Sequence, residues 1–422
     1  MRIAILGAGF TGLSAAYHLS KKGHNVFVFE KEKILGGLAQ GYERKEWDWP
    51  LDKYYHHLFT NDKSALLLAK VVGQDILTLT PKTSTLINNA ITQLDSPMSL
   101  IKFSLLSITE RLRMGAALAL FRFSPTYKFF EKYTANNFLP KLMGDKGFKM
   151  IWSPLFIAKF GKHAKDVSLA WFWARIKKRT TSLAYPKGGF QSFANKIMLA
   201  AKNNNAKIFL DSEIIEIGSN YIKFKKNGVL KKELFDKIIV TIPSSVFLKI
   251  SKSIPNEYFE KLKNLQSLAT TNLLLRLKKP FLKDNTYWLN ICDPNSKLMA
   301  VVEHTNFIDK QKYNNETLVY IGHYVPHGHQ YLGMTKEELL KKFTPYLLRL
   351  NKDFEKNLIG IELSKNLFAQ PVATINYKDK IPSFKTGISG VYLANMDQIY
   401  PWDRGVNYAI ELGIKIAKIC CE

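Results

Sequence analysis

The sequence predicts an α/β protein organised around a dinucleotide-binding unit near its N-terminus. Residues 3–6 form a short apolar run without polar alternation, as expected for a strand buried on both faces. A glycine turn follows at once, then an apolar helix over about residues 11–22, and then a second apolar strand over residues 25–30. Strand, turn, helix and strand in this order are typical of parallel strands joined by a crossover helix.

The turn after the first strand carries Gly7, Gly9 and Gly12 in G-x-G-x-x-G spacing. The first glycine permits a tight turn, the second lets a pyrophosphate approach the backbone, and the third lets the helix pack on the strand. Glu30 ends the second strand, where a carboxylate can hold ribose hydroxyls and disfavours the 2′-phosphate of NADP. A glycine turn without a ligand would leave Glu30 unexplained. The residues predicted to hold the nucleotide are Gly7, Gly9, Phe10, Thr11, Gly12, Glu30 and Lys31.

A second glycine turn, Leu35-Gly36-Gly37, follows the second strand. It resembles the second glycine pair of FAD enzymes with the glutathione-reductase-like fold, notably the amine oxidase, protoporphyrinogen oxidase and phytoene desaturase group. The resemblance implies FAD as the cofactor. In that group an arginine usually follows the two glycines, whereas this chain has Leu38. No second G-x-G-x-x-G unit is present, so an internal NAD(P)H domain is not expected.

The C-terminal end extends the resemblance over the whole chain. Residues 390–396 predict a strand and turn, and residues 401–407 predict the start of a helix that continues through residue 419. FAD enzymes of this group end in the same way, which implies that the N-terminal N–H groups of the last helix face the flavin ring. The further cofactor residues implied by the resemblance are Gly36, Gly37, Leu38, Ile214 (against the adenine), Asn395, Asp397, Gly405, Val406 and Asn407.

Residues 51–59 resemble the segment that runs beside the flavin ring in this group, where UDP-galactopyranose mutases carry a Gly-Pro-His-x-Phe stretch. The candidate catalytic residues are therefore Tyr55, His56 and His57, with His57 slightly preferred. Adjacent histidines on a strand point in opposite directions, so the pair does not predict a metal site. Asn272 stands where many amine oxidases have a lysine near the flavin, which argues against simple amine oxidation.

The resemblance also implies two interleaved domains: an FAD-binding domain over residues 1–60, 186–245 and 386–422, and a substrate domain over residues 61–185 and 246–385. Residues 185–190, Tyr-Pro-Lys-Gly-Gly-Phe, resemble the segment by which the relatives return to the FAD domain. The substrate domain is a mixed sheet with a helical insertion, in which residues 99–123 and 126–138 predict helices. Aromatic residues guessed to wall the substrate are Tyr55, Trp152, Trp171 and Trp173.

The chain is strongly basic, with 61 Lys and Arg against 35 Asp and Glu and a formal net charge of +26. A lysine-rich coding bias and peripheral binding to an anionic membrane both account for the excess. Nucleic acid is not expected, because the basic residues are scattered and no nucleic-acid motif occurs. No apolar run reaches the roughly 18 residues of a membrane span, and no signal peptide is expected. Three cysteines without metal or disulfide spacing favour the cytoplasm, including the inner face of the membrane.

Together these features predict an FAD-dependent oxidoreductase. The expected reaction removes a hydride from a C–N or C–C bond of an apolar or amphipathic small molecule, isoprenoid- or tetrapyrrole-like, and oxygen, a quinone or a partner reoxidises the flavin. Two alternatives stay open. One is a non-redox enzyme similar to UDP-galactopyranose mutase that acts on a nucleotide sugar. The other is an FAD-binding protein at a membrane without turnover.

Overall fold

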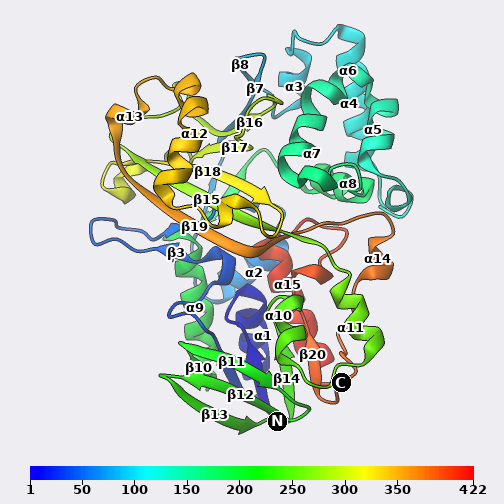
Figure 1. Ribbon diagram of the computed structural model, residues 1–422, viewed down its shortest axis with the longest axis vertical. Coiled ribbons are helices and arrows are strands. Elements are labelled where there is room, and N and C mark those ends of the chain that lie inside the picture. Colours follow the sequence, from blue (N-terminus) through cyan, green and yellow to red (C-terminus); the bar gives the residue numbers. More distant parts are fainter.

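The computed structural model describes all 422 residues and has three parts (Figure 1). A parallel sheet with its helices lies at the bottom of the view, and a large mixed sheet and a group of helices lie above it. The predicted α/β class, with a nucleotide-binding type of sheet beside mixed-sheet and helical parts, is therefore confirmed. The exact domain limits given above stay a prediction.

The parallel sheet has the strand order β10-β2-β1-β14-β20. Its two faces are both covered, which explains the unbroken apolar runs of the sequence. Ile3 and Ile5 of β1 pack in one core with α1, whereas Ala4 and Leu6 pack in another with the small β11–β13 sheet. The strands are β1 (Arg2–Leu6), β2 (Asn25–Phe29), β10 (Lys207–Phe209), β14 (Lys237–Val240) and β20 (Val391–Leu393), with β11 (Ser212–Ile217), β12 (Tyr221–Lys226) and β13 (Val229–Leu234) alongside.

Several helices belong to this lower part of the molecule. They are α1 (Phe10–Lys21), α2 (Lys63–Val71), α9 (Gly189–Asn203), α10 (Ser244–Ile250), α11 (Asn256–Lys263) and α15 (Val406–Ile419). Two small sheets join it to the rest, formed by β3 (Gly41–Tyr42) with β4 (Leu51–Asp52), and by β5 (Leu58–Phe59), β9 (Leu183–Pro186) and β6 (Ile76–Leu79).

The large sheet has the order β19-β15-β18-β17-β16-β7-β8 and is antiparallel except between β16 and β7. Its strands are β7 (Lys82–Ile87), β8 (Ala90–Gln93), β15 (Ser267–Leu277), β16 (Thr286–Ile291), β17 (Ala300–Glu303), β18 (Thr317–Val325) and β19 (Leu358–Pro371). The helices that follow this sheet in the chain are α12 (Lys336–Leu350), α13 (Phe354–Asn357) and α14 (Tyr377–Lys380).

The helical part has a core of its own, and its helices are shorter than the sequence pattern predicts. The expected helix over residues 99–123 is interrupted at residues 102–107, because Ser107 and Glu110 form a capping box that starts a new helix. Residues 126–129 are not helical, and the next α-helix begins only after the cap Thr134. The helices are α3 (Pro97–Ile101), α4 (Ile108–Phe123), α5 (Ala135–Met143), α6 (Asp145–Gly147), α7 (Ser153–Phe160) and α8 (Leu169–Lys178).

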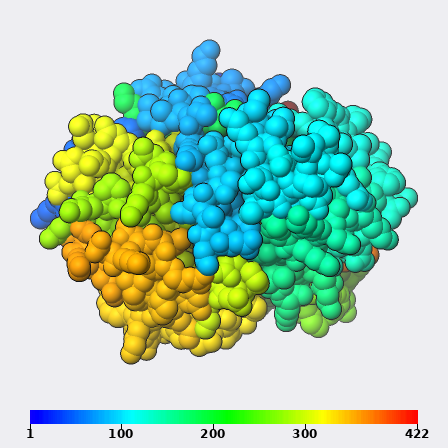
Figure 2. Space-filling model, turned by 90° about the horizontal axis from the view of Figure 1, so that it is seen from above, coloured from blue at the N-terminus to red at the C-terminus, as the bar shows by residue number.

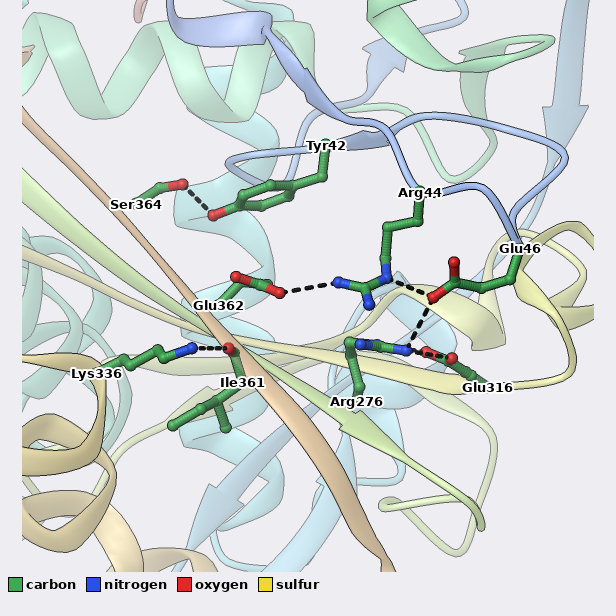
Figure 3. Close-up of polar contacts among 9 residues, drawn as sticks. All are labelled: Tyr42, Arg44, Glu46, Arg276, Glu316, Lys336, Ile361, Glu362 and Ser364. Carbon is green, nitrogen blue, oxygen red and sulfur yellow. Dashed lines mark hydrogen bonds and ion pairs between the residues drawn. The ribbon is translucent and has the colours of Figure 1, made fainter.

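A network of charges ties the loop after β3 to the large sheet (Figure 3). Arg44 pairs with Glu46 at 2.7 Å and with Glu362 of β19 at 3.1 Å. Arg276 of β15 donates to both carboxylate oxygens of Glu316 and also lies 3.5 Å from Glu46. Because a planar guanidinium holds a carboxylate in a fixed orientation, these pairs set the position of the chain that leads from the second glycine turn to β4.

Seen from above, the helical part and the large sheet form two lobes, with the chain of β7 and β8 between them (Figure 2). Both chain termini lie at the opposite end, below the parallel sheet (Figure 1). None of the helices combines the length and the hydropathy that crossing a membrane requires.

Candidate functional site

The first glycine turn has two glycines that the fold requires and one that it does not. Gly7 has a φ of +105°, which side chains rarely adopt, and a Cβ at Gly12 would lie 2.0 Å from the Gly7 carbonyl oxygen. At Gly9, an added Cβ would meet nothing nearer than the Cα of Gly37, at 3.9 Å. Contacts within the chain therefore leave room for a side chain at Gly9, and a ligand that approaches this backbone accounts for the glycine.

Helix α1 begins at this turn with N–H groups that no side chain caps. Its N-cap is Gly9, and no acidic residue lies in its first turn. The second glycine turn packs against the first, since Gly9 and Gly36 form a bridge and Gly36 donates its N–H to the Ala8 carbonyl at 2.9 Å. The two turns form a backbone cradle at the positive end of a helix, which suits a phosphate group.

Glu30 lies beside this cradle and is buried. Its carboxylate accepts the N–H of Ala8 at 2.8 Å and the N–H of Glu32 at 3.0 Å, which fixes its orientation. The Glu30 carbonyl accepts the N–H of Ser212 at 2.8 Å, so β11 starts next to the end of β2. Ile214 follows two residues later on β11, close to the acid that is predicted to hold the ribose.

Four other predicted cofactor residues flank the two turns. Phe10 and Thr11 are buried in the first turn of α1. The side chain of Lys31 is exposed and pairs with Glu32 at 3.5 Å, and Leu38 is half-buried next to the second glycine turn. Lys31 and Leu38 could therefore contact a phosphate mainly through their backbone groups.

The last helix, α15, brings a second uncapped N-terminus to the same side of the molecule. Its N-cap is Gly405, without a side-chain cap or an acidic residue in the first turn. Because β1 and β20 belong to one parallel sheet, the turns that follow them lie at the same edge. The two helices also touch: Ser14 donates to the Ile410 carbonyl at 3.0 Å, and a Cβ at Gly413 would lie 2.5 Å from the Thr11 carbonyl oxygen.

Three predicted cofactor residues use their side chains inside the chain. Asn395 donates to the Ser244 hydroxyl at 3.0 Å, and that hydroxyl donates to Asp397 at 2.6 Å. Asn407 accepts the N–H of Ala65 at 3.0 Å and so caps the first turn of α2. These side chains position the loops around the start of α15, a role that their sequence pattern does not reveal.

The candidate catalytic segment is half-buried and packs against three different elements. The Tyr55 ring covers Gly322 of β18, where a Cβ would lie 2.6 Å from the ring. The His56 ring lies 5.6 Å from the Phe190 ring of α9, and Nδ1 of His57 lies 3.3 Å from the hydroxyl of Tyr287 on β16. The structure thus sets the three predicted residues between the parallel sheet's helices and the large sheet.

Both histidines are neutral at physiological pH. Burial, reinforced by the charge of Arg404, lowers the pKa of His56 to about 4. Burial, reinforced by the charge of Arg179, lowers the pKa of His57 to about 3. Burial raises the pKa of Tyr55 to about 12, so its hydroxyl keeps its proton. The segment therefore offers neutral donors and acceptors without adding a charge.

The two segments that resemble the flavin group, residues 51–59 and 185–190, meet at Asp52. Its carboxylate accepts the Tyr185 hydroxyl at 2.8 Å and the N–H of Phe190 at 3.2 Å. Burial raises the pKa of Asp52 to about 7. Asn272, at the position of the amine oxidase lysine, is buried and donates to the Lys53 carbonyl at 2.7 Å, so no cation stands at that point.

A cluster of charges lies directly before α15 and was not among the predicted site residues. Asp403 pairs with Lys159 of α7 at 3.1 Å and with Arg175 of α8 at 2.7 Å. Its carboxylate also accepts the Trp171 indole N–H and the Arg404 backbone N–H, both at 3.1 Å. Burial alone would raise the pKa of Asp403, but the Lys159 and Arg175 charges hold that pKa below its usual range.

The cluster continues through Arg404, whose guanidinium donates to the Tyr324 hydroxyl of β18. Tyr324 lies two residues after Gly322, the residue that Tyr55 covers, so both contacts are on one face of the strand. The only sequence signal for this cluster is that Asp403 and Arg404 immediately precede Gly405. Their partners on α7 and α8 are more than 200 residues away in the sequence.

The aromatic residues guessed to wall the substrate divide between the site and the helical core. The Trp171 ring lies 4.7 Å from the Lys159 ammonium, at the cluster. Trp173 is instead 2% exposed and packs on Trp402, because α8 is buried on nearly all sides over residues 169–174. Trp152 packs edge-on against a phenylalanine of the helical core. The guess therefore fits Tyr55 and Trp171 better than the other two.

The donor set fits a flavin nucleotide on three points: the open Gly9 backbone, the buried acid Glu30 and the uncapped start of α15. The family model described as "Flavin containing amine oxidoreductase" matches residues 10–421. The chain belongs to this family. The predicted superfamily and the class of flavin-containing oxidoreductases are thus confirmed.

Curated relatives match this chain over part of its length. A coproporphyrinogen III oxidase of Staphylococcus aureus is 27% identical over 325 residues, which cover 65% of this chain and 66% of the relative. A 15-cis-phytoene desaturase of Synechococcus elongatus is 43% identical over 49 residues, 12% of this chain and 10% of the relative. The chain spans about a tenth of the length of the first curated relatives it matches.

Solved structures match over nearly the whole chain. A reduced UDP-galactopyranose mutase has a TM-score of 0.75 at 16% identity, covering 99% of this chain and 94% of that one. A putrescine oxidase has a TM-score of 0.74 at 13% identity, covering 100% and 100%. A candidate protoporphyrinogen oxidase from Exiguobacterium sp. 255-15 has a TM-score of 0.72 at 15% identity, covering 100% and 98%. At these identities the likeness shows a common fold.

Proposed function

We propose that the chain is an FAD-dependent oxidoreductase that removes a hydride from a C–N or C–C bond of an apolar or amphipathic small molecule. The substrate is isoprenoid- or tetrapyrrole-like, and oxygen, a quinone or a partner reoxidises the flavin. The observation that carries the proposal is that two uncapped helix N-termini, those of α1 and α15, lie on the side of the parallel sheet where its strands end. One suits a pyrophosphate and the other an electron-rich ring edge.

FAD, when bound, supplies the hydride acceptor. In this proposal the backbone at Gly9 and the first turn of α1 bind the pyrophosphate, and Glu30 binds the ribose. The first turn of α15, from Gly405, stabilises negative charge on the ring. His56 and His57 orient the substrate as neutral groups and keep water out, since burial holds the pKa of each well below 7.

The substrate class is supported by two curated relatives whose names are those of a coproporphyrinogen oxidase and a phytoene desaturase. A small amine is disfavoured, because the buried Asn272 replaces the lysine of many amine oxidases. We place the protein itself, as part of this proposal, in the cytoplasm or at the inner face of the cell membrane.

The cofactor part of the proposal is tested with Gly9→Ala. The added Cβ comes no nearer than 3.9 Å to another atom of the protein, so the variant is expected to fold. The methyl group would nevertheless occupy the space through which the pyrophosphate approaches the backbone. We expect the purified wild type to be yellow and to release FAD on heating, and Gly9→Ala to be colourless with an unchanged circular dichroism spectrum. Gly115→Ala, in the middle of α4, is the matched control and keeps the flavin. A wild-type protein that neither contains nor takes up FAD would refute the proposal.

The redox part is tested without oxygen. Coproporphyrinogen III or phytoene is expected to bleach the flavin absorption band, which would exclude an FAD-binding protein without turnover. A flavin that stays oxidised with both probes contradicts the proposed reaction.

A second candidate is a non-redox enzyme on a nucleotide sugar, favoured by the cationic cluster around Asp403 and by the fold shared with UDP-galactopyranose mutase. Such an enzyme would convert UDP-galactopyranose only after reduction with dithionite. Turnover under those conditions, without net flavin oxidation, would replace the first proposal by this one.

We also propose peripheral contact with an anionic membrane through α3 and α4. The outer side of α4 presents Ile108, Leu112 and Phe123 at 64–78% exposure, at helical spacing, and α3 adds Met98 and Ile101. Exposed large apolar side chains on a chain with a net charge of +26 favour an anionic bilayer as the partner of this surface.

A further inference from the structure

The cluster before α15 holds more positive than negative charge. Lys159, Arg175 and Arg404 converge there from α7, α8 and the loop before α15, and Asp403 is the one carboxylate that pairs with the Lys159 and Arg175 side chains. Only the backbone N–H of Arg404 donates to it. Lys159 and Arg175 share that carboxylate, and the remaining acceptors of Asp403 are taken by neutral N–H groups. The side chains of Lys159 and Asp403 are only 16% and 17% exposed, whereas the Arg175 side chain is 44% exposed and reaches solvent.

Arg404 has no carboxylate within ion-pair distance. Its guanidinium contacts the Tyr324 hydroxyl, lies 5.1 Å from the Tyr324 ring, and leaves Nε buried without a hydrogen-bond partner. A guanidinium stays charged at any physiological pH, and a buried charge without a counter-ion is costly. An anion at this point would supply the missing partner.

The cluster is next to the candidate catalytic segment. The Arg404 charge acts on both Tyr55 and His56, and the Arg175 charge acts on His57. A molecule held here by one end would therefore lie along the segment proposed to flank the flavin ring. The aromatic faces of Trp171 and Tyr324 form the rest of the lining, since the Lys159 ammonium lies 4.7 Å and 5.6 Å from their ring centres.

Resting on the proposed function, we propose that Lys159, Arg175 and Arg404 form an oxyanion subsite that receives a carboxylate or phosphate group of the substrate. The subsite fixes one end of the substrate, so that the apolar remainder lies between Tyr55 and the flavin. A guanidinium pairs with two oxygens of either group, whereas the ammonium acts as a point charge. The substrate class is then an amphipathic acid or an apolar phosphate ester. Of the two probes above, coproporphyrinogen III, an acid, is therefore expected to bleach the flavin, and phytoene, a neutral hydrocarbon, is not.

The subsite is tested on the flavin-loaded protein with inorganic pyrophosphate and with succinate, each titrated at low salt by calorimetry. We expect saturable binding of one of these anions. Lys159→Gln and Arg404→Gln should each weaken it by about tenfold, as expected for loss of one charge-assisted hydrogen bond. Tighter binding of pyrophosphate would identify a phosphate ester, and tighter binding of succinate a carboxylic acid. The matched control is Lys162→Gln, an exposed lysine three residues from Lys159, which should change the affinity by less than about twofold.

The pH profile provides an independent readout. Burial lowers the pKa of Lys159 to about 7, against the attraction of Asp403 and with the repulsion of Arg175 and Arg404. The affinity for succinate should therefore fall as the pH rises through about 7, and the succinate profile of Lys159→Gln should be flat over the same range.

Each outcome decides between the proposals. If the wild type binds flavin but neither anion, or if both variants bind as tightly as the wild type, the subsite is refuted and the flavin proposal stands. If Arg404→Gln loses the flavin while Lys159→Gln keeps anion affinity, Arg404 belongs to the cofactor site and the inference is overturned. Arg404→Lys, which keeps the charge, should retain the fold and part of the anion affinity. If the wild type takes up no flavin, the proposed function is refuted, and the subsite proposal that rests on it is refuted with it.

Discussion

At the scale of single residues, the same amino acid serves different purposes within one short turn. Gly7 and Gly12 are required by backbone conformation and packing, whereas the surroundings of Gly9 would accept a methyl group. The same distinction applies to the charged residues. Arg276 and Glu316 satisfy one another, whereas Arg404 has an unsatisfied donor. A residue whose partner is missing within the chain is the better candidate for ligand binding.

The Arg276–Glu316 pair gives the first residue-scale prediction. The two side chains are 11% and 7% exposed, so Arg276→Gln leaves a nearly buried carboxylate without its counter-ion. We expect a loss of about 3–5 kcal/mol in the free energy of unfolding, measured by urea denaturation. Lys263→Gln, which removes the exposed pair with Glu260, should cost less than about 1 kcal/mol. Equal losses in the free energy of unfolding for the two substitutions would show that the buried pair stabilises the fold no more than an exposed pair does.

The second residue-scale prediction concerns pH. Burial lowers the pKa of His304 to about 3, from 6.5, and the ring is held by the Tyr313 hydroxyl at 2.9 Å. As the pH falls below 6.5, the unfolded chain takes up a proton at His304 that the folded chain refuses, so the wild type loses stability. His304→Gln lacks this group, so its loss of stability relative to the wild type should shrink by about 3 kcal/mol between pH 7 and pH 4. A deficit that is constant across urea titrations at these pH values would contradict the assignment.

At the scale of elements, the site depends on how α1 packs against α15. Gly413 allows this contact, because any side chain there meets the backbone of α1. The contact fixes how α15 crosses the first turns of α1, eight residues after its own N-cap Gly405, and both helix starts are uncapped. Helix packing, rather than any single side chain, therefore determines whether the two halves of the proposed flavin site face one another.

Gly413→Ala tests this contact. Its Cβ would lie 2.5 Å from the Thr11 carbonyl oxygen and 2.6 Å from the Ser14 Cβ, so the helices have to separate. We expect a loss of about 1–3 kcal/mol in stability together with weaker FAD binding, measured by thermal unfolding and by flavin content. Gly333→Ala, in a loop where a Cβ meets nothing nearer than 3.6 Å, is the control. Full flavin content in Gly413→Ala would show that FAD binding does not depend on the contact between α1 and α15.

At the scale of the whole molecule, the proposed sites fall in different places. The proposed flavin and anion sites lie where the parallel sheet, the large sheet and the helical part meet, while the apolar side of α3 and α4 lies on the helical part (Figure 1). A membrane bound at α3 and α4 would therefore leave the parallel sheet, with both termini, on the far side of the molecule.

Membrane contact is tested by flotation with vesicles of phosphatidylglycerol and phosphatidylcholine. Leu112→Glu places a charge in the exposed apolar stripe without touching the core and should abolish flotation. Leu230→Glu, an equally exposed leucine on β13, should float like the wild type. Flotation of all three proteins alike would attribute binding to net charge alone and remove α4 from the proposal.

By itself, the sequence determined the nucleotide-binding unit, because strand, turn, helix and acid follow one another within about 30 residues and obey local rules of burial and backbone conformation. The likeness of the two chain ends to flavin enzymes predicted the family correctly. Tertiary structure alone decided that α3 and α4 are separate helices, that Asn407 caps α2, and that Lys159 and Arg175 pair with Asp403 next to Arg404. Those arrangements join residues far apart in the chain, and only the packing of whole elements brings such residues within reach of one another.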